Sequence, residues 1–185
     1  YKLFDEGIVN ARDHHVRMAD SLTLGDHQVK QISVQIDQNI GEISIMNDGN
    51  GIDIAKHPEH ELWIPEMIFG HLRTSTNYNS KQKRTVGGKN GFGFKLVLIY
   101  SYYGRIETVD HTRGLKYVQE FKNNLDEICK PKITKCKSKP YTKVTFIPDF
   151  KRFGVSKLSD EMYSIMRKRT YDIGAVTNKG VKVTF

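Results

Sequence analysis

The chain has 185 residues, 38% of them hydrophobic and 27% charged, and it carries a net charge of +8 at pH 7. This length fits one domain with its own core, and no apolar run reaches the roughly 20 residues that a membrane-spanning helix needs. The only two cysteines, Cys129 and Cys136, have a spacing that fits no common zinc motif, so free thiols in a reducing compartment are expected. The positive charge fits a plain basic surface as well as it fits a polyanionic partner such as a nucleotide or nucleic acid.

The chain begins with a predicted helix over residues 1–19, in which Glu6, Asn10 and Asp13 recur at a helical spacing and therefore share one face. Residues 31–37 alternate between polar and apolar side chains and predict a strand. The elements expected next are a turn at 38–41, the second strand of a hairpin from residue 43, and a tight polar loop, Asn47-Asp48-Gly49-Asn50-Gly51.

Residues 60–72 predict a helix that could start afresh at Pro65, because proline is tolerated in the first turn. Residues 73–90 are polar and predict a long loop, and long ordered loops in compact domains are usually functional. The remaining expected elements are an apolar helix at 94–101, strands at 105–110, 115–121, 132–136 and 141–147, an amphipathic helix at 156–173 and a last strand at 181–185. This order indicates an α+β fold, with a mixed, largely antiparallel sheet and helices on one face.

A glycine-rich segment precedes the apolar helix. Residues 85–95 read Thr-Val-Gly-Gly-Lys-Asn-Gly-Phe-Gly-Phe-Lys, with four glycines in seven residues. Backbone N–H groups of such a loop and the positive end of the helix dipole form a cradle for phosphate, and Lys95 in the first turn could reach a terminal phosphate. Two well-known phosphate motifs do not fit, because Phe94 occupies the lysine position of a Walker A loop and Leu96 the third glycine of a dinucleotide fingerprint.

Two other groups of residues suit nucleotide hydrolysis. Glu6 could orient and deprotonate a water, and Asn10, one helical turn away, offers an amide oxygen to Mg²⁺. The plain alternative for this pair is a solvated helix face. Asn47, at a strand end and followed by Gly49 and Gly51, could bond the edge of a flat base while the glycines let the ligand approach. The plain alternative here is an ordinary turn.

The three motifs together resemble those of the GHKL ATPase superfamily in content and order: E-x3-N on a helix, N-D-G-N-G after a strand, and G-G-K-N-G-F-G-F-K opening a helix. Further segments make essentially the whole chain similar to the ATPase domain of eukaryotic-type DNA topoisomerase II, in particular to the version carried by large cytoplasmic DNA viruses. These segments are residues 4–11, 43–49, 65–70, 74–78, 141–149 and 169–173. The resemblance implies the Bergerat sandwich, which is the α+β fold of GHKL ATPases.

Carried over position by position, the resemblance implies that Glu6 is the general base, that Asn10 is a Mg²⁺ ligand and that Lys95 contacts the triphosphate. Asn47 and Thr142 match the contacts to adenine. The other positions that match nucleotide-binding residues are the apolar walls Ile52, Ile68 and Phe69, the ribose and phosphate contacts Ser75, Thr76 and Asn77, the phosphate loop Gly88, Lys89, Asn90, Gly91, Phe92 and Gly93, and the helix residue His14.

The chain departs from the family pattern at three places. His14 stands where the family usually has an asparagine that helps to hold the nucleotide, so the adenine-side network is expected to differ. Gly7 replaces an aliphatic residue beside the base, a change expected to weaken the helix by roughly 1 kcal/mol. Asp48 follows Asn47 directly, and the sequence leaves open which of the two meets the base.

The resemblance implies that the chain binds and hydrolyses ATP with Mg²⁺, as the gate module of a type IIA topoisomerase that passes one DNA duplex through another. It also implies that residues 1–185 are one GHKL ATPase domain, with an N-terminal strap before it and a transducer domain, bearing a second catalytic lysine, after it. The expected partners are ATP, double-stranded DNA and, in the full-length enzyme, a second subunit of a homodimer, with no membrane contact. The expected location is intracellular, in the host cytoplasm for a viral protein and in the nucleus for a cellular one.

Three rival functions are weighed against this one. The first is another GHKL ATPase, of the chaperone or mismatch-repair type, against which the segments 74–78 and 142–149 argue. The second is a histidine kinase catalytic domain, which usually lacks a carboxylate at the position of Glu6. The third is a basic DNA-binding module without enzymatic activity, which predicts no affinity for nucleotides.

Overall fold

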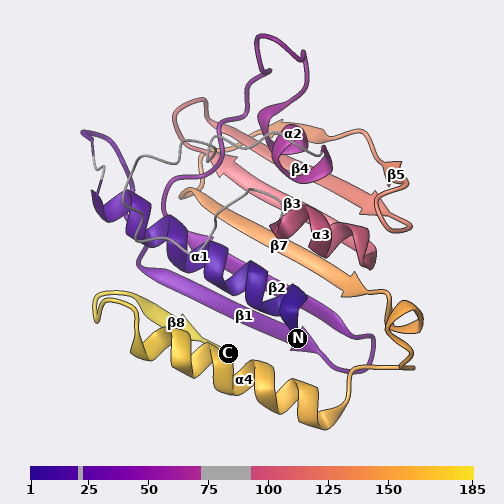
Figure 1. Ribbon diagram of the computed structural model, residues 1–185. Coiled ribbons are helices and arrows are strands. Elements are labelled where there is room, and N and C mark those ends of the chain that lie inside the picture. The colour runs from indigo at the N-terminus through magenta and orange to yellow at the C-terminus, as the bar shows by residue number, and fades with distance from the viewer. Residues whose placement is uncertain (21–22, 72–92) are drawn as a thin grey trace, which may run out of the picture.

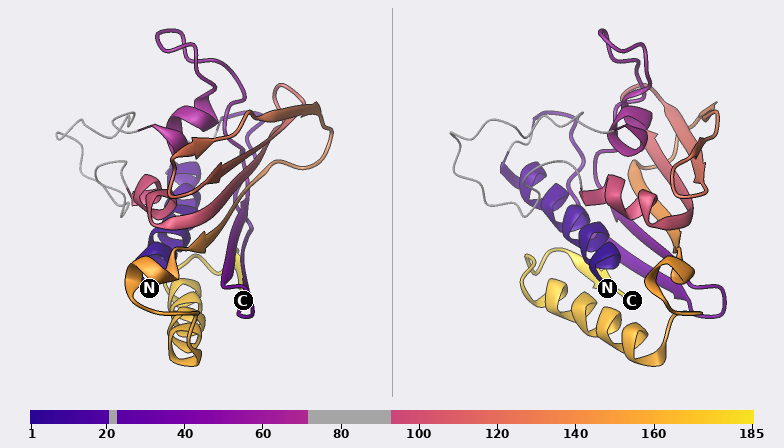
Figure 2. Two further views of the ribbon diagram at one scale, coloured as in Figure 1. Left: turned by 90° about the vertical axis from the view of Figure 1, so that its right-hand side faces the viewer. Right: turned by 45° about the vertical axis from the view of Figure 1, so that its right-hand side comes forward.

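The computed structural model describes residues 1–20, 23–71 and 93–185. In these ranges the chain forms an eight-stranded sheet with helices along one of its faces (Figures 1 and 2). The helices are α1 (Lys2–Asp20), α2 (Ile64–Gly70), α3 (Gly93–Ile99) and α4 (Asp160–Ala175), together with the short 3₁₀ helix η1 (Phe150–Phe153). No helix in these ranges is long and apolar enough to cross a membrane.

The strands are β1 (Gln31–Asp37), β2 (Glu42–Asp48), β3 (Ser101–Asp110), β4 (Leu115–Lys122), β5 (Glu127–Ile128), β6 (Lys132–Lys135), β7 (Tyr141–Pro148) and β8 (Lys182–Thr184). Their order across the sheet is β5-β4-β3-β7-β2-β1-β8, and β6 pairs with another part of β4. Among the described strands only β1 and β8 run parallel, and every other pairing is antiparallel. The predicted α+β architecture, a largely antiparallel sheet with helices on one face, is therefore confirmed.

One row of side chains crosses the centre of the helix-covered face. Val34, Ile45, Val144 and Ile106 lie opposite one another in the register of β1, β2, β7 and β3, and each is at most 8% exposed. Side chains two positions apart in a strand point to the same face. The residues two positions beyond this row in β2 and β7 therefore also face the helices, next to the apolar core.

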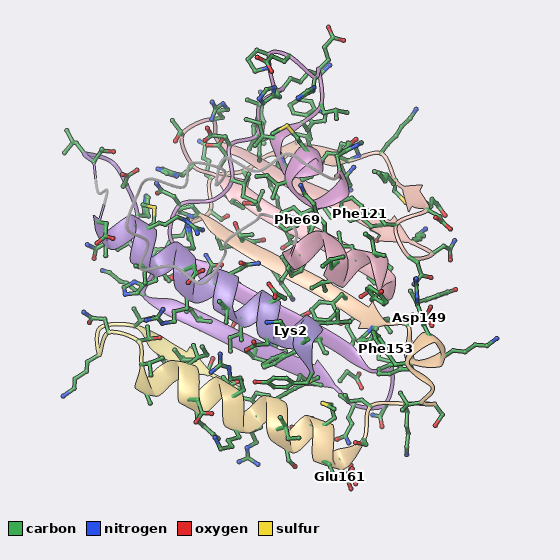
Figure 3. The ribbon with its side chains drawn as sticks, viewed as in Figure 1. Lys2, Phe69, Phe121, Asp149, Phe153 and Glu161 are labelled. Atoms are coloured by element: carbon green, nitrogen blue, oxygen red, sulfur yellow. The ribbon has the colours of Figure 1, made fainter. Side chains whose placement is uncertain are left out.

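The helices α1 and α3 cover the middle of the sheet and supply further core residues. Phe4 and Ile8 of α1 are fully buried. Phe94 of α3 makes edge-to-face contacts with Phe69 of α2 and Phe146 of β7, with ring centroids 5.3 and 6.2 Å apart. Figure 3 labels Phe69, which lies where α2 faces the sheet. Such aromatic pairs stabilise a core by about 0.5–1.5 kcal/mol beyond their buried area, and here they fix α2 and α3 against each other.

The helix α4 lies alongside α1 at the β1–β8 end of the sheet (Figure 1). Met166 and Ile173 of α4 are buried in the core. Arg169 donates from Nε to Asp5 Oδ1 at 2.8 Å, which ties α4 to the first turns of α1. Cys129 and Cys136 follow β5 and β6, at the other end of the sheet, and both are free thiols as expected.

Several element boundaries differ from those predicted. The strand β2 continues to Asp48, so Asn47 and Asp48 belong to the strand and not to the loop predicted at 47–51, because their pairing with Thr142 and Tyr141 extends the ladder. The helix α2 is shorter than the predicted span of 60–72. It starts at Ile64, with proline in its first turn.

The later boundaries shift for local reasons. The helix α4 begins at Asp160 and not at 156, because the Ser159 hydroxyl caps it by accepting a hydrogen bond from Met162 N at 3.2 Å. The strand β3 begins at Ser101, four residues before the predicted start at 105. The sequence predicts neither β5 nor η1, which are only two and four residues long and carry no periodicity that could reveal them.

Candidate functional site

The helix α1 carries Glu6, Asn10 and His14 along one face, at intervals of four residues. His14 lies at the far end of this row, where its Nε2 is 2.9 Å from the carbonyl oxygen of Asn50 in the loop after β2. Burial, with a smaller effect of the Arg17 charge, lowers the pKa of His14. A neutral imidazole next to a carbonyl oxygen must donate its proton there, so His14 ties α1 to this loop.

Glu6 lies at the other end of the row, against the first residue of α3. A Cβ built on Gly93 would overlap Glu6 Oε2 and would lie 2.9 Å from Glu6 Cδ. The carboxylate therefore sits directly over the point at which the glycine-rich segment becomes a helix. Lys2, one turn earlier on α1, places its Nζ 3.0 Å from Glu6 Oε1. Asn10 is half-buried between these two ends of the row.

A cavity of about 620 Å³ opens beside Glu6 and Gly93. Its lining is mainly apolar and comes from the start of α1, from α3, from η1 and from the start of α4, including Leu96, Tyr100 and Phe150. Asn47 and Thr142 are not part of this lining. Within the described residues, the cavity therefore borders the Glu6 end of the candidate site and not its Asn47 end.

Asn47 and Thr142, the two predicted adenine contacts, are direct cross-strand partners in β2 and β7. Asn47 is 8% exposed, and its side-chain amide donates to the carbonyl oxygen of Asp48 at 3.0 Å. Thr142 Oγ1 is 3.0 Å from Thr108 Oγ1 on the next strand, β3. Both residues lie two positions beyond the central apolar row, so both face the helices.

Asp48 has a different position and a structural task. Its Oδ1 accepts hydrogen bonds from the backbone N–H groups of Lys30 and Gln31, both at 2.7 Å. Neighbouring residues of a strand point to opposite faces, so the Asp48 side chain lies on the face away from the helices and joins the start of β1 to the end of β2. Of the two residues that the sequence left open, Asn47 is the one on the helix side.

The loop after β2 is pressed against β3. Ile52 N donates to Thr108 Oγ1 at 2.9 Å, and a Cβ built on Gly51 would overlap the carbonyl oxygen of Val109. A glycine is therefore required at position 51. The contact brings half-buried Ile52 next to the Thr108–Thr142 pair, on the edge of the core.

Thr108 and Asn50 are the two residues of this site that sequence reasoning missed. Thr108 joins the loop to the sheet, and Asn50 accepts from His27 N through Oδ1 at 2.8 Å and donates to Asp26 at 2.6 Å. Neither belongs to a recognisable spacing, because both act through partners far away in the sequence. The position of Asn50 within N-D-G-N-G was the only available signal for either residue.

The two apolar candidates on α2 differ in how far they are exposed. Phe69 is 7% exposed and packs against Phe94, whereas Ile68 on the same helix is 36% exposed.

Gly7 lies on the buried side of α1, and a Cβ at this position would be 2.6 Å from Ile45 Cδ1. The glycine thus lets α1 lie close to β2, and Ile45 occupies the space that a larger residue at position 7 would need.

Lys95 lies in the first turn of α3, as predicted, and is only 2% exposed. Burial lowers the pKa of its ammonium group, because low-dielectric surroundings disfavour the charged form. An anion brought next to this side chain would favour the charged form again. The remaining predicted site residues, Ser75, Thr76, Asn77, Gly88, Lys89, Asn90, Gly91 and Phe92, and the loop predicted at 73–90, lie outside the described residues.

The chain is similar to known proteins in sequence and in fold. The sequence profile described as "Histidine kinase-, DNA gyrase B-, and HSP90-like ATPase" matches residues 1–152. A curated relative from Acanthamoeba polyphaga mimivirus, named DNA topoisomerase 2, is 49% identical over 181 residues, and DNA topoisomerase 2 of Saccharomyces cerevisiae is 46% identical over 174 residues. These matches cover 98% and 94% of the chain but only 14% and 12% of the relatives, so the chain spans less than a sixth of their length.

Solved structures show the same fold. The ATPase region of Saccharomyces cerevisiae topoisomerase II superposes with a TM-score of 0.86 at 46% identity, covering 93% of this chain and 44% of that one. The ATPase and transducer domains of DNA topoisomerase II from Balamuthia mandrillaris superpose with a TM-score of 0.89 at 39% identity, covering 100% of this chain and 46% of that one. The expected GHKL ATPase fold is confirmed by these likenesses.

Proposed function

Because the chain belongs to the family of histidine kinase-, DNA gyrase B- and HSP90-like ATPases, we propose that it is the ATP-binding and ATP-hydrolysing gate module of a type IIA DNA topoisomerase. The observation that carries the proposal is the position of the Glu6 carboxylate against Gly93, at the N-terminus of α3. It joins a candidate base to the end of the glycine-rich segment. Asn47 and Thr142 lie together at the opposite end of the site, which gives the nucleotide a direction.

The phosphate end of the site supports hydrolysis by positioning and electrostatics. Glu6 would align a water and accept its proton during attack on the terminal phosphate. Asn10, one turn away on α1, provides the neutral oxygen ligand that suits Mg²⁺, which usually takes few protein ligands together with substrate phosphates and waters. The ion would neutralise developing charge on the phosphates. Buried Lys95 supports the same chemistry, because a triphosphate next to it would raise the pKa that burial lowers and would be stabilised by its positive charge.

The base end supports recognition of a flat polar edge. Asn47 offers an amide oxygen and amide protons on the helix side of β2, and Thr142 and Thr108 add hydroxyl groups in the adjoining strands. Ile52, held by Thr108, supplies an apolar wall next to them. Buried polar groups of this kind select a ligand whose own polar edge pairs with them, because a mismatched ligand leaves them without partners.

Asn47→Ala should weaken the binding of a non-hydrolysable ATP analogue by about 1–3 kcal/mol, which is a factor of roughly 5 to 150. Asp48→Ala serves as the matched control, since it removes a carboxylate that bonds Lys30 and Gln31 on the other face. The control should lower the unfolding temperature and leave the dissociation constant nearly unchanged. The affinity of both variants for the ATP analogue is measured by calorimetric titration. An equal loss of affinity in the two would contradict the assignment of Asn47 as a contact to the base.

The remaining parts of the proposal concern the full-length protein. Binding of ATP would close two copies of this domain as a gate, and hydrolysis would reset the gate while one DNA duplex passes through another. A strap before residue 1 would join the two subunits, and a lysine of a following transducer domain would complete the phosphate site. The positive net charge of +8 suits the passage of DNA near the domain.

The proposal is tested by titrating the ATP analogue with Mg²⁺ into residues 1–185 and into the full-length protein, and by measuring steady-state turnover of both. We expect weak binding, negligible hydrolysis and a monomer for residues 1–185, and DNA-stimulated turnover by a dimer for the full-length protein. Turnover that DNA does not stimulate would favour a chaperone or mismatch-repair type of ATPase. Robust hydrolysis by monomeric residues 1–185 would show that no further lysine is needed.

A further inference from the structure

The turn between β2 and α2 holds a cluster of metal-ligating side chains that the ATPase chemistry does not use. His57, Glu59 and His60 each offer one ligand atom, and these atoms all lie within 4.8 Å of one another. The two imidazole rings stack, with centroids 5.0 Å apart and an interplanar angle of 24°. The turn projects from the body of the molecule beyond α2 (Figures 1 and 2), far from the end of α1 at which Lys2 is labelled in Figure 3. The cluster is therefore separate from the proposed phosphate site.

Backbone contacts define the shape of this turn. Lys56 and Trp63 form a β-bridge at its base. Within the turn, His57 N donates to Leu62 O at 2.8 Å, and Glu61 N donates to His57 O at 3.0 Å. Glu61 adopts a left-handed conformation, with φ of 52°, to close the turn. A site on such a frame loses little backbone entropy when it binds an ion.

The side chains are also partly oriented. His57 Nδ1 accepts a hydrogen bond from Glu59 N at 3.2 Å, which fixes the plane of that ring. Glu59 and His60 are exposed, so their side chains can rotate towards a common centre without disturbing the core. Ligand atoms around a tetrahedral ion with bonds of 2.0–2.2 Å lie roughly 3.3 Å apart, and binding would draw the three ligand atoms from within 4.8 Å to this spacing.

The local charge favours a cation. The segment 57–62 contains the carboxylates of Glu59 and Glu61 and neither lysine nor arginine, in a chain whose net charge is +8. Lys56, the nearest cation in the sequence, has its Nζ 5.9 Å from the centroid of the Trp63 ring. The turn therefore carries more negative than positive charge on an otherwise basic protein, and this local charge favours a divalent cation.

We propose that His57, Glu59 and His60 form a binding site for Zn²⁺, with water in the remaining coordination position. Two imidazole nitrogens and one carboxylate oxygen match the ligand set of zinc sites that have three protein ligands and one open position. Mg²⁺ prefers oxygen ligands in an octahedral arrangement and is reluctant to accept imidazole, so this site does not compete for the ion that accompanies ATP. The bound zinc cross-links the turn and stabilises the entry to α2, where Ile64 N donates to Ala55 O at 2.9 Å.

The test is a calorimetric titration of Zn²⁺ into the protein in excess Mg²⁺, together with thermal unfolding at each metal concentration. We expect one Zn²⁺ to bind per protein chain. The unfolding temperature should rise with the zinc concentration, since binding to the folded state stabilises it. His60→Ala and Glu59→Gln should each weaken the zinc affinity by more than about 10-fold, since loss of even an outer-shell partner costs about 10- to 100-fold, and should remove the rise in unfolding temperature. Co²⁺ in place of Zn²⁺ should give visible absorption bands in the wild type that both variants lose.

His111→Ala is the matched control. His111 also belongs to a histidine pair, with its ring centroid 4.6 Å from that of His27, but its Nε2 is 3.1 Å from the carbonyl oxygen of Gly25. This control should bind zinc as the wild type does. An unchanged zinc affinity in both cluster variants, an equal loss in His111→Ala, or the absence of saturable binding in the wild type would each overturn the proposal. Unfolding in metal-free buffer identifies any variant that fails to fold, and Glu59→Gln then decides the result, because it changes neither volume nor backbone.

Discussion

Replacing Glu6 with glutamine is expected to lower ATP turnover of the full-length protein by at least about 100-fold, while the affinity for a non-hydrolysable ATP analogue stays nearly unchanged. Glutamine keeps the size of the side chain and its place over Gly93 but cannot accept a proton from water. The ion pair with Lys2 is also lost, but the side chain of that lysine is 73% exposed, and such surface pairs contribute little to stability. The loss is therefore expected in the rate and not in folding.

The neighbouring carboxylate provides the control for this experiment. Asp5 is one residue earlier on α1 and accepts from Arg169 Nε at 2.8 Å, so it joins α1 to α4. Asp5→Asn should lower the unfolding temperature and leave turnover within about twofold of the wild type, as expected for a change outside the reacting groups. Steady-state hydrolysis, analogue titration and thermal unfolding of both variants distinguish the two roles. Normal turnover in Glu6→Gln would remove the general base from the proposed mechanism.

Much of the fold could be predicted because its signals are local. The alternation in 31–37 and the helical spacing in 1–19 describe β1 and α1 to within a residue at each end. The predicted strands at 115–121, 132–136 and 141–147 also match β4, β6 and β7 to within one residue at each end. In α1, β1 and β4 the buried residues recur at the period of the element, which is the pattern that the sequence displays.

The errors arise where a long-range contact decides the local structure. Asn47 and Asp48 look like turn residues by composition, but pairing with β7 keeps them in the strand. Residues 60–63 were predicted to begin a helix, but the bridge between Lys56 and Trp63 holds them in a turn before α2. No single-sequence pattern contains these pairings, because the partners are set by tertiary structure.

The sequence pointed to only part of the candidate site, because some of its residues are brought together by long-range contacts. Glu6 and Asn10 follow from a helical spacing and from a family resemblance, and the structure adds that Glu6 meets Gly93. The choice between Asn47 and Asp48 required the register of the sheet, which puts their side chains on opposite faces. Thr108 could not be found at all, because its role depends on a hydroxyl lying between β7 and the loop after β2.

Gly93→Ala should lower ATP turnover without lowering the stability of the fold. The new methyl group would overlap Glu6 Oε2 and would be 2.9 Å from Cδ, so the carboxylate must rotate away from α3. Only the end of a flexible side chain moves, and alanine in place of glycine at the first residue of α3 does not weaken the helix. The fold should therefore be as stable as that of the wild type or more stable. A displacement of a catalytic group by about 1 Å can cost on the order of 100-fold in rate, and turnover of the full-length protein should fall by about 10- to 100-fold.

Gly174→Ala is the matched control for this change, because it makes the same substitution in another helix of the sheet-covering layer. A Cβ at position 174 would lie 3.5 Å from Val183 Cβ, an ordinary contact, and it would touch no group of the candidate site. The control should therefore gain helix stability and keep full turnover. Turnover and thermal unfolding of the two variants in the full-length protein form the comparison. Because both variants gain a single methyl group in a helix, a difference in rate between them isolates the displacement of Glu6. If Gly93→Ala turned over ATP as fast as Gly174→Ala, the position of the Glu6 carboxylate over α3 would have no part in hydrolysis.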